Sequence, residues 1–223
     1  MEGSWRSIWE SKASESDFSA SGRSSADARQ LFALLTDACA ALSPKATDIL
    51  LDLGCGVGLL ARHLTSHVGM VVGLDFAPPL LSRARLSAPA GRFVSGTAVA
   101  LPFRASSFSK LLASSVLQYL DGDDLVEVAL REMRRVVAPD GCAFVSGNPD
   151  LRRKAEYLAG IDNLDLPEER KVVLRERNQK AFWLSPETAV AMAGRNGWTT
   201  EIRPISPAVW QSFYMFDLLL TAR

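Results

Sequence analysis

The residues of this chain best suited to chemistry follow two neighbouring apolar runs. The run Ile49–Leu53 contains one acid, Asp52, and glycines follow it at alternate positions: Gly54, Gly56 and Gly58. Glycine allows a ligand to approach the backbone closely, because no side chain stands in the way. The next run, Met70–Leu74, ends in a second acid, Asp75. An acid at the end of such a strand can accept hydrogen bonds from both ribose hydroxyl groups, so the pattern indicates a nucleoside site.

Alternating strands and helices are needed to position these residues. Apolar runs and helical spacing predict strands and helices in turn over residues 47–147, with a turn at Pro139–Gly141. The predicted strands are Asp48–Leu53, Val71–Asp75, Arg92–Ser95, Phe108–Ser114 and Cys142–Ser146. The predicted helices are Val57–Ser66, Pro78–Leu86 and Asp123–Val137. This alternation is typical of a doubly wound α/β sheet.

The segments before and after residues 47–147 show other sequence patterns. Residues 1–45 hold a polar segment with embedded aromatics and then a helix from Ser25 to Leu42, so we expect a helical lid that folds back over the core. Residues 148–183 are charged and break the alternation, which predicts a helical insertion. Residues 184–223 predict a helix with Ser185 as its N-cap, then two strands. Residues 46–147 form the predicted cofactor-binding core of a single domain of 223 residues.

Composition narrows the class of protein. Lys plus Arg equals Asp plus Glu at 25 each, so no overall charge attracts nucleic acid or an anionic membrane. Three cysteines without a Cys-x-x-Cys pair predict neither a disulfide framework nor a metal site. The first 25 residues lack the apolar core of a secretion signal. We therefore expect a cytoplasmic protein, and we expect it to be monomeric or homodimeric.

Residues 47–146 resemble the class I S-adenosylmethionine-dependent methyltransferases of the small-molecule type (methyltransferase type 11-like). Five segments carry the resemblance, in the family's order and spacing: Asp52-x-Gly54-x-Gly56-x-Gly58, Asp75, Ala100–Phe103, Val116–Leu120 and Arg134–Gly141. The resemblance implies a Rossmann-like sheet of seven strands in the order 3-2-1-4-5-7-6, with the last strand antiparallel. It also implies S-adenosylmethionine as the cofactor.

The cofactor's charged parts agree with this choice, since S-adenosylmethionine carries an ammonium, a carboxylate and a sulfonium but no pyrophosphate. Asp52 is predicted to help hold the ammonium, directly or through water. Backbone N–H groups around Gly54, Cys55 and Gly56 are expected to meet the amino-acid part. Gly58 would let the following helix pack close to the sheet. Asp75 is assigned to the ribose.

Further cofactor contacts follow from the same resemblance. Phe76 is expected against the adenine or in the core. The loop after the third strand supplies Thr97, Ala98 and Val99, although an acid is common where Thr97 stands. Ser114 ends the fourth strand, and Arg23 of the lid is placed to meet the cofactor carboxylate or an anionic acceptor.

Methyl transfer requires mainly proximity, alignment and exclusion of water. A general base is needed only if the acceptor must lose a proton. Both histidines fall on the helix after the glycine turn, so we expect a surface position for His63. Gln118 and Tyr119 follow the fourth strand and are weak catalytic candidates that more simply line a pocket. The predicted acceptor-binding residues are Tyr119, Asn148, Trp183 and Tyr214.

Two alternatives stay open from the sequence. A cofactor-binding protein without methyl transfer, such as a regulatory subunit, is consistent with Thr97 and with the missing base. A nicotinamide-dependent oxidoreductase is less consistent, because its fingerprint needs Gly-x-Gly-x-x-Gly. Here the third glycine, Gly58, comes one residue early and Leu59 fills the expected place.

Overall fold

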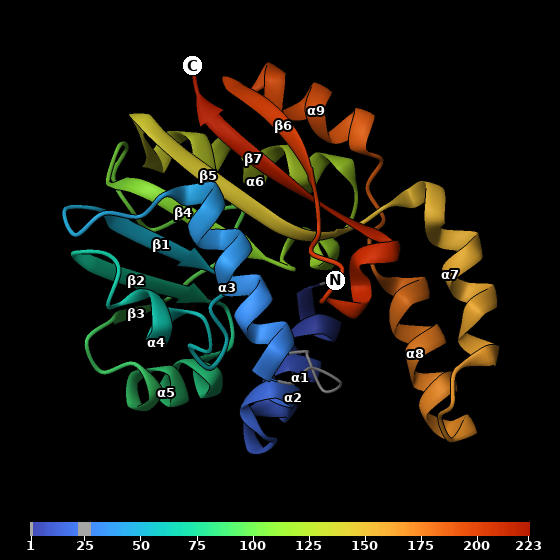
Figure 1. Ribbon diagram of the computed structural model, residues 1–223. Coiled ribbons are helices and arrows are strands. Elements are labelled where there is room, and N and C mark those ends of the chain that lie inside the picture. Colours follow the sequence, from blue (N-terminus) through green and yellow to red (C-terminus); the bar gives the residue numbers. More distant parts are fainter. Residues whose placement is uncertain (1, 22–27) are drawn as a thin grey trace.

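A computed structural model describes residues 2–21 and 28–223 of the chain. The described residues form one seven-stranded sheet with helices on both faces (Figure 1). The strands are β1 (Ile49–Leu53), β2 (Met70–Asp75), β3 (Arg92–Ser95), β4 (Phe108–Ser114), β5 (Val137–Pro149), β6 (Trp198–Pro204) and β7 (Met215–Ala222). The α-helices are α1 (Glu2–Ser11), α2 (Asp17–Ala20), α3 (Ala28–Leu42), α4 (Ala61–Leu64), α5 (Pro78–Ser87), α6 (Asp123–Val136), α7 (Lys154–Gly160), α8 (Glu168–Lys180) and α9 (Pro186–Arg195).

The strand order is β3-β2-β1-β4-β5-β7-β6, which confirms the predicted fold class. Strands β1 to β5 pair in parallel, and β7 runs antiparallel to both β5 and β6. In the register, Asp52 pairs with Gly73 of β2 and with Leu112 of β4. The carboxyl ends of the central strands therefore meet at one edge, which is where ligands bind in open α/β sheets.

Alternate side chains of the strands build two apolar layers. Leu50 packs in the layer under α3 and α5, whereas its neighbour Leu51 packs in the layer with α6 and α9. This alternation follows from the two-residue period of a strand. Both faces of the strands are buried in this way, so the sheet is a rigid base for the loops at its edge.

The helix after the glycine turn is shorter than predicted. The sequence predicts a helix over residues 57–66, but α4 contains only Ala61–Leu64, with turns before it. Gly56 and Gly58 have φ angles of +53° and +76°, which a right-handed helix does not allow. The predicted turn at Pro139–Gly141 is also wrong, because these residues belong to β5, at a register shift against β4.

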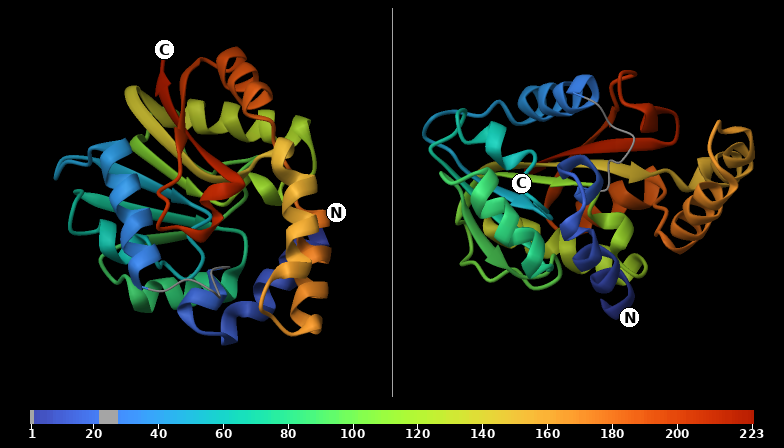
Figure 2. Two further views of the ribbon diagram at one scale, coloured as in Figure 1. Left: turned by 45° about the vertical axis from the view of Figure 1, so that its right-hand side comes forward. Right: turned by 90° about the horizontal axis from the view of Figure 1, so that it is seen from below.

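Two helical appendages flank the carboxyl edge of the sheet. One consists of α1 and α2 at the N-terminus, and the other of α7 and α8 after β5 (Figures 1 and 2). Pro167 directly precedes α8, and the Ser185 hydroxyl accepts a hydrogen bond from the Thr188 N–H at the start of α9, as predicted for an N-cap. Among the described residues, no helix is both long and apolar enough to cross a membrane.

Candidate active site

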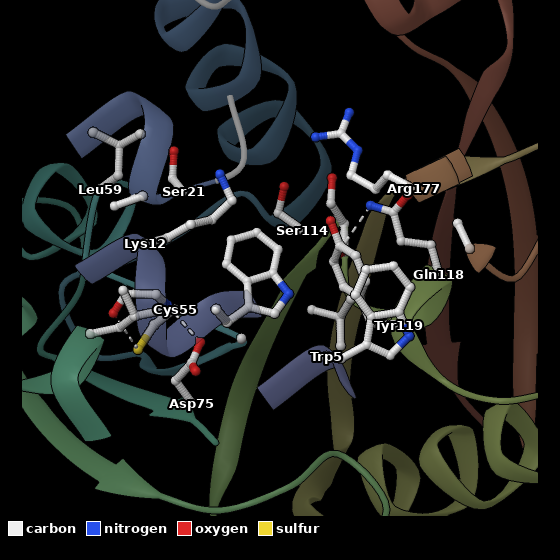
Figure 3. A pocket seen from close by; sticks show the side chains of 18 of the residues that line it. Trp5, Lys12, Ser21, Cys55, Leu59, Asp75, Ser114, Gln118, Tyr119 and Arg177 are labelled. Carbon is white, nitrogen blue, oxygen red and sulfur yellow. Dashed lines mark hydrogen bonds between the residues drawn. The ribbon is translucent and has the colours of Figure 1, made fainter. Parts of the chain in front are cut away.

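A cavity of about 760 Å³ opens at the carboxyl edge of the sheet. Its lining joins the ends of β1, β2 and β4 to residues of α1, of α8 and of the 3-10 helices η2 (Leu117–Tyr119) and η5 (Trp210–Phe213). Figure 3 shows Asp75 and Cys55 on one side of the cavity and Gln118, Tyr119 and Arg177 on the other. We call these sides the strand side and the helix side. A cavity of this volume is typical of a site for a small ligand.

The glycine turn forms the wall of the strand side. Gly54 and Gly56 have positive φ angles of 72° and 53°, a conformation that disfavours other residues. A Cβ atom on Gly54 would lie 2.6 Å from Cγ2 of Val116, whereas one on Gly56 would meet nothing within 4 Å. Gly54 is therefore required by packing. Gly56 instead presents a bare backbone to the open cavity.

Asp75 is held tightly beside this turn. Its Oδ2 accepts a hydrogen bond from the Gly56 N–H at 2.9 Å, and its Oδ1 accepts one from the Ala77 N–H at 2.9 Å. Burial raises the pKa of the carboxyl group, while these backbone hydrogen bonds act in the opposite direction. A carboxylate oxygen has two lone pairs, so each oxygen of Asp75 can still accept a ligand hydroxyl.

The backbone N–H groups of the glycine turn donate to acceptors within the protein. Gly54 and Cys55 both donate to the carbonyl of Leu74, at 2.7 and 3.0 Å, and Gly56 donates to Asp75. These three N–H groups therefore tie the turn to β2, because a buried N–H must find an acceptor. Their contact with the amino-acid part of a cofactor stays a prediction.

The other predicted cofactor residues are distributed around the strand side. Asp52 is buried and lines the cavity at the end of β1. Phe76 lines it too, with the Arg6 guanidinium 5.6 Å from its ring centroid, so one face of this ring is already covered. Further lining residues on this side are Cys55, Thr97, Ala98, Val99 and Ser114. Burial, with Asp52 and Asp75 nearby, raises the pKa of the Cys55 thiol well above its usual value, so it stays a neutral side chain.

Three predicted residues do not face the cavity, and Arg23 lies outside the described residues. Gly58 packs against α5 rather than easing a helix onto the sheet, since a Cβ atom there would lie 3.2 Å from Ala84. Asn148 of β5 is buried, and its side-chain amide donates to the carbonyls of Val145 and of Phe216 on β7. Trp183 donates its indole N–H to the Asn178 carbonyl at 2.7 Å. The predicted direct contact of Asn148 and Trp183 with an acceptor is corrected accordingly, because both belong to the supporting core.

Aromatic rings dominate the helix side near η2. The ring of Tyr119 contacts Trp5 and Trp9 of α1 edge to face, with centroid distances of 4.9 and 5.2 Å. Gln118 is buried beside it and donates its amide to the Ser115 carbonyl at 3.3 Å. Trp5 and Trp9 of the N-terminal segment thus pack against η2, and both line the cavity.

Tyr214 lines the cavity beneath α8. Its ring lies 4.2 Å from that of Tyr157, centroid to centroid, and Asn178 donates to the Tyr157 hydroxyl at 3.1 Å. Burial raises the pKa of Tyr214 well above its usual value. Tyr214 is therefore a neutral phenol that can give or accept a hydrogen bond, and not a base at neutral pH.

Several lining residues were missed by the sequence reasoning. They include one face of α8, made by Arg170, Val173, Leu174, Arg177 and Asn178. Their spacing of three and four residues was a signal for a helix face, but nothing in the sequence said what that face would meet. His63, expected at the surface, does not line the cavity, and its Nε2 accepts a hydrogen bond from Arg62.

Comparison with known proteins agrees with the geometry. Residues 51–145 match the family model described as a methyltransferase domain. Over 104 residues the chain is 40% identical to a demethylmenaquinone methyltransferase of Thermus thermophilus, covering 44% of this chain and 46% of that protein. Over 108 residues it is 32% identical to an uncharacterized methyltransferase of Synechocystis, covering 48% and 49%. The matches thus span about half the length of these relatives.

A solved structure shares the fold over nearly the whole chain. It belongs to a Haloferax volcanii complex that contains the Trm112 methyltransferase activator, with a TM-score of 0.71, 16% identity and coverage of 96% and 97% of the two chains. At this identity the likeness concerns the fold. The matched family model and the methyltransferase relatives assign residues 51–145 to a methyltransferase domain, and the strand order around them is that of the class I S-adenosylmethionine-dependent methyltransferases, whose cofactor is S-adenosylmethionine.

Proposed function

We propose that this protein transfers a methyl group from S-adenosylmethionine to an oxygen, nitrogen or carbon atom of a small-molecule acceptor. The observation that carries the proposal is the continuity of the cavity, which joins the Asp52–Asp75 side of the sheet to an aromatic-lined space under α1 and α8. Such a cavity brings two ligands together in one enclosure, and proximity is the main requirement of this reaction.

The strand side fits the cofactor. Gly56 offers an open backbone surface, Asp75 keeps lone pairs for the two ribose hydroxyls, and buried Asp52 suits a cationic ammonium. When bound, S-adenosylmethionine supplies a methyl group already activated by its sulfonium. Neighbouring Thr97 and Ala98 would line the adenine end.

The chain's own residues would then position and shield the acceptor. Trp5, Trp9 and Tyr119 would cover the junction of the two sides and exclude water, and the N-terminal segment would act as a lid. Gln118 is fixed by its bond to the Ser115 carbonyl, and its amide oxygen would orient a polar group of the acceptor. Neither histidine lines the cavity, so we assign catalysis to positioning rather than to a histidine base.

Calorimetry with S-adenosylhomocysteine, the product form of the cofactor, tests the first half of this proposal. We expect micromolar binding to the wild-type protein with one ligand per chain. The absence of binding would refute the proposal. Binding without methyl transfer to any of a broad panel of acceptors would favour a regulatory protein instead.

A further inference from the structure

The helix side of the cavity contains a half-buried positive charge that the cofactor chemistry does not use. Arg177 lines the cavity from α8, in the face that also carries Leu174 and Asn178. Among the described residues, the structure gives this guanidinium no ion pair and no hydrogen bond, although other arginines of the appendage are paired. Arg175 of the same helix, for example, pairs with both Asp162 and Glu168.

Three other charged residues of the helix side are more exposed than Arg177. Arg170, Asp121 and Asp165 line the cavity as exposed residues, so water screens them at the rim. Arg177 lies deeper, beside the aromatic cluster. A partly desolvated guanidinium without a carboxylate partner favours an anionic ligand, because the ligand replaces the hydration that burial removes.

The position of Arg177 is well fixed. Its carbonyl accepts the Ala181 N–H at 2.9 Å, and the next residue, Asn178, is bonded to the Tyr157 hydroxyl and to the Trp183 indole. Figure 3 shows Arg177 on the same side of the cavity as Gln118 and Tyr119. The guanidinium is therefore presented on a supported element rather than on a free loop.

The side chains that line the cavity around Arg177 indicate the shape of the rest of the ligand. Trp5, Tyr119, Trp210 and Tyr214 line the same space, and aromatic walls favour a flat, conjugated molecule. We infer that the acceptor is a planar small molecule that carries a carboxylate or phosphate, and that Arg177 binds this anionic group while the atom to be methylated faces the strand side. This inference rests on the proposed function and adds the chemical class of the acceptor.

Binding of simple anions tests the inference. We would measure benzoate and phenyl phosphate by calorimetry, with benzamide as the neutral counterpart of benzoate, in protein with and without saturating S-adenosylhomocysteine. The variants are Arg177→Gln, Arg177→Lys and, as the matched control on the same helix, Arg175→Gln. Thermal unfolding of each variant separates a local effect from a loss of folding.

We expect at least one anion to bind the wild type more tightly than benzamide. Arg177→Gln should raise its Kd about tenfold or more, Arg177→Lys should raise it less, and Arg175→Gln should leave it within twofold. Two results would overturn the inference: no anion binds at millimolar concentration, or anions bind Arg177→Gln as well as they bind the wild type.

Measuring cofactor binding distinguishes a failure of this inference from a failure of the proposed function. If Arg177→Gln weakens S-adenosylhomocysteine binding and leaves the anions unaffected, Arg177 holds the cofactor carboxylate and the inference is wrong. If the wild type binds the anions through Arg177 but never binds S-adenosylhomocysteine, the proposed function fails while the anion site stands.

Discussion

The two sides of the cavity are built in different ways. The strand side consists of backbone and short side chains at the ends of β1, β2 and β4, with Gly54 and Gly56 in the turn after β1 and Asp75 at the end of β2. The helix side consists of long side chains from segments far apart in the chain, such as Trp5, Arg177 and Tyr214. The proposed nucleoside site is therefore formed by the sheet itself, whereas the proposed acceptor site is formed by the segments attached to the sheet.

Their chemistry differs in the same sense. The strand side holds two buried acids, Asp52 and Asp75, and the helix side holds aromatic rings and a half-buried arginine. Buried acids suit ammonium and hydroxyl groups, and both S-adenosylmethionine and S-adenosylhomocysteine carry these groups. In the proposed function the rings and the arginine would select among acceptors, so substitutions on the two sides should separate cofactor binding from acceptor choice.

The largest effect is expected on the strand side. Asp75→Ala removes the acceptor of the Gly56 and Ala77 N–H groups together with the proposed ribose ligand. Two charge-assisted hydrogen bonds of about 1.5–3 kcal/mol each predict a loss of S-adenosylhomocysteine affinity of about 100-fold or more. Calorimetry measures this loss. An affinity within tenfold of the wild type would show that the sheet edge is not the nucleoside site.

Stability and its pH dependence test the support beneath the helix side. Asp217 of β7 accepts the Gly147 N–H at 2.8 Å, and burial raises its pKa to about 6. The folded protein binds this proton more tightly than the unfolded chain, so the free energy of unfolding falls as pH rises from about 4 to about 6.

Asp217→Asn replaces the titratable carboxyl group with a neutral amide. The free energy of unfolding should then change less between about pH 4 and about pH 6. At pH 8 we expect the variant to be more stable by up to about 3 kcal/mol, since each pKa unit is worth about 1.4 kcal/mol. Urea unfolding across the pH range measures the effect. Equal slopes for the variant and the wild type would mean that Asp217 titrates normally.

A matched pair of glycine substitutions tests whether the strand side is built from backbone. Gly56→Ala should cost about 1 kcal/mol of stability through its positive φ and weaken S-adenosylhomocysteine about tenfold, because the methyl group enters the cavity. Gly54→Ala should destabilise more strongly, because its methyl group would collide with Val116. Thermal unfolding and calorimetry separate the two effects. Equal melting temperatures for the two variants would contradict this distinction.

The smallest effect is expected where the N-terminal segment joins the core. Arg83 of α5 donates to the carbonyls of Ala13 and Glu15 and pairs with Asp17, which also pairs with Arg62. Arg83→Ala should loosen the N-terminal segment and raise the dissociation rate of S-adenosylhomocysteine a few-fold, with Arg62→Ala showing less. Stopped-flow fluorescence measures these rates. An unchanged rate in Arg83→Ala would mean that the segment does not cover the ligand.

The sequence predicted some details of the site and missed others for physical reasons. The local sequence pattern was sufficient to predict the strand ends that carry Asp52 and Asp75. Apolar runs and turn glycines involve only residues that are neighbours in the chain. It failed for the helix after the turn, where the positive φ angles of Gly56 and Gly58 delay α4 to Ala61. Trp183 and Tyr214 looked equivalent as aromatic candidates, yet only Tyr214 lines the cavity.

The amino-acid sequence by itself determined the glycine turn and the two acids of the strand side, since glycines and acids at fixed spacing dictate such a turn over about 25 residues. Only the tertiary structure decided the helix side, where Trp5, Arg177 and Tyr214 line one cavity. The arrangement of these residues depends on how α1, α8 and η5 pack. Packing between segments that are distant in the chain produces no periodic pattern in the sequence.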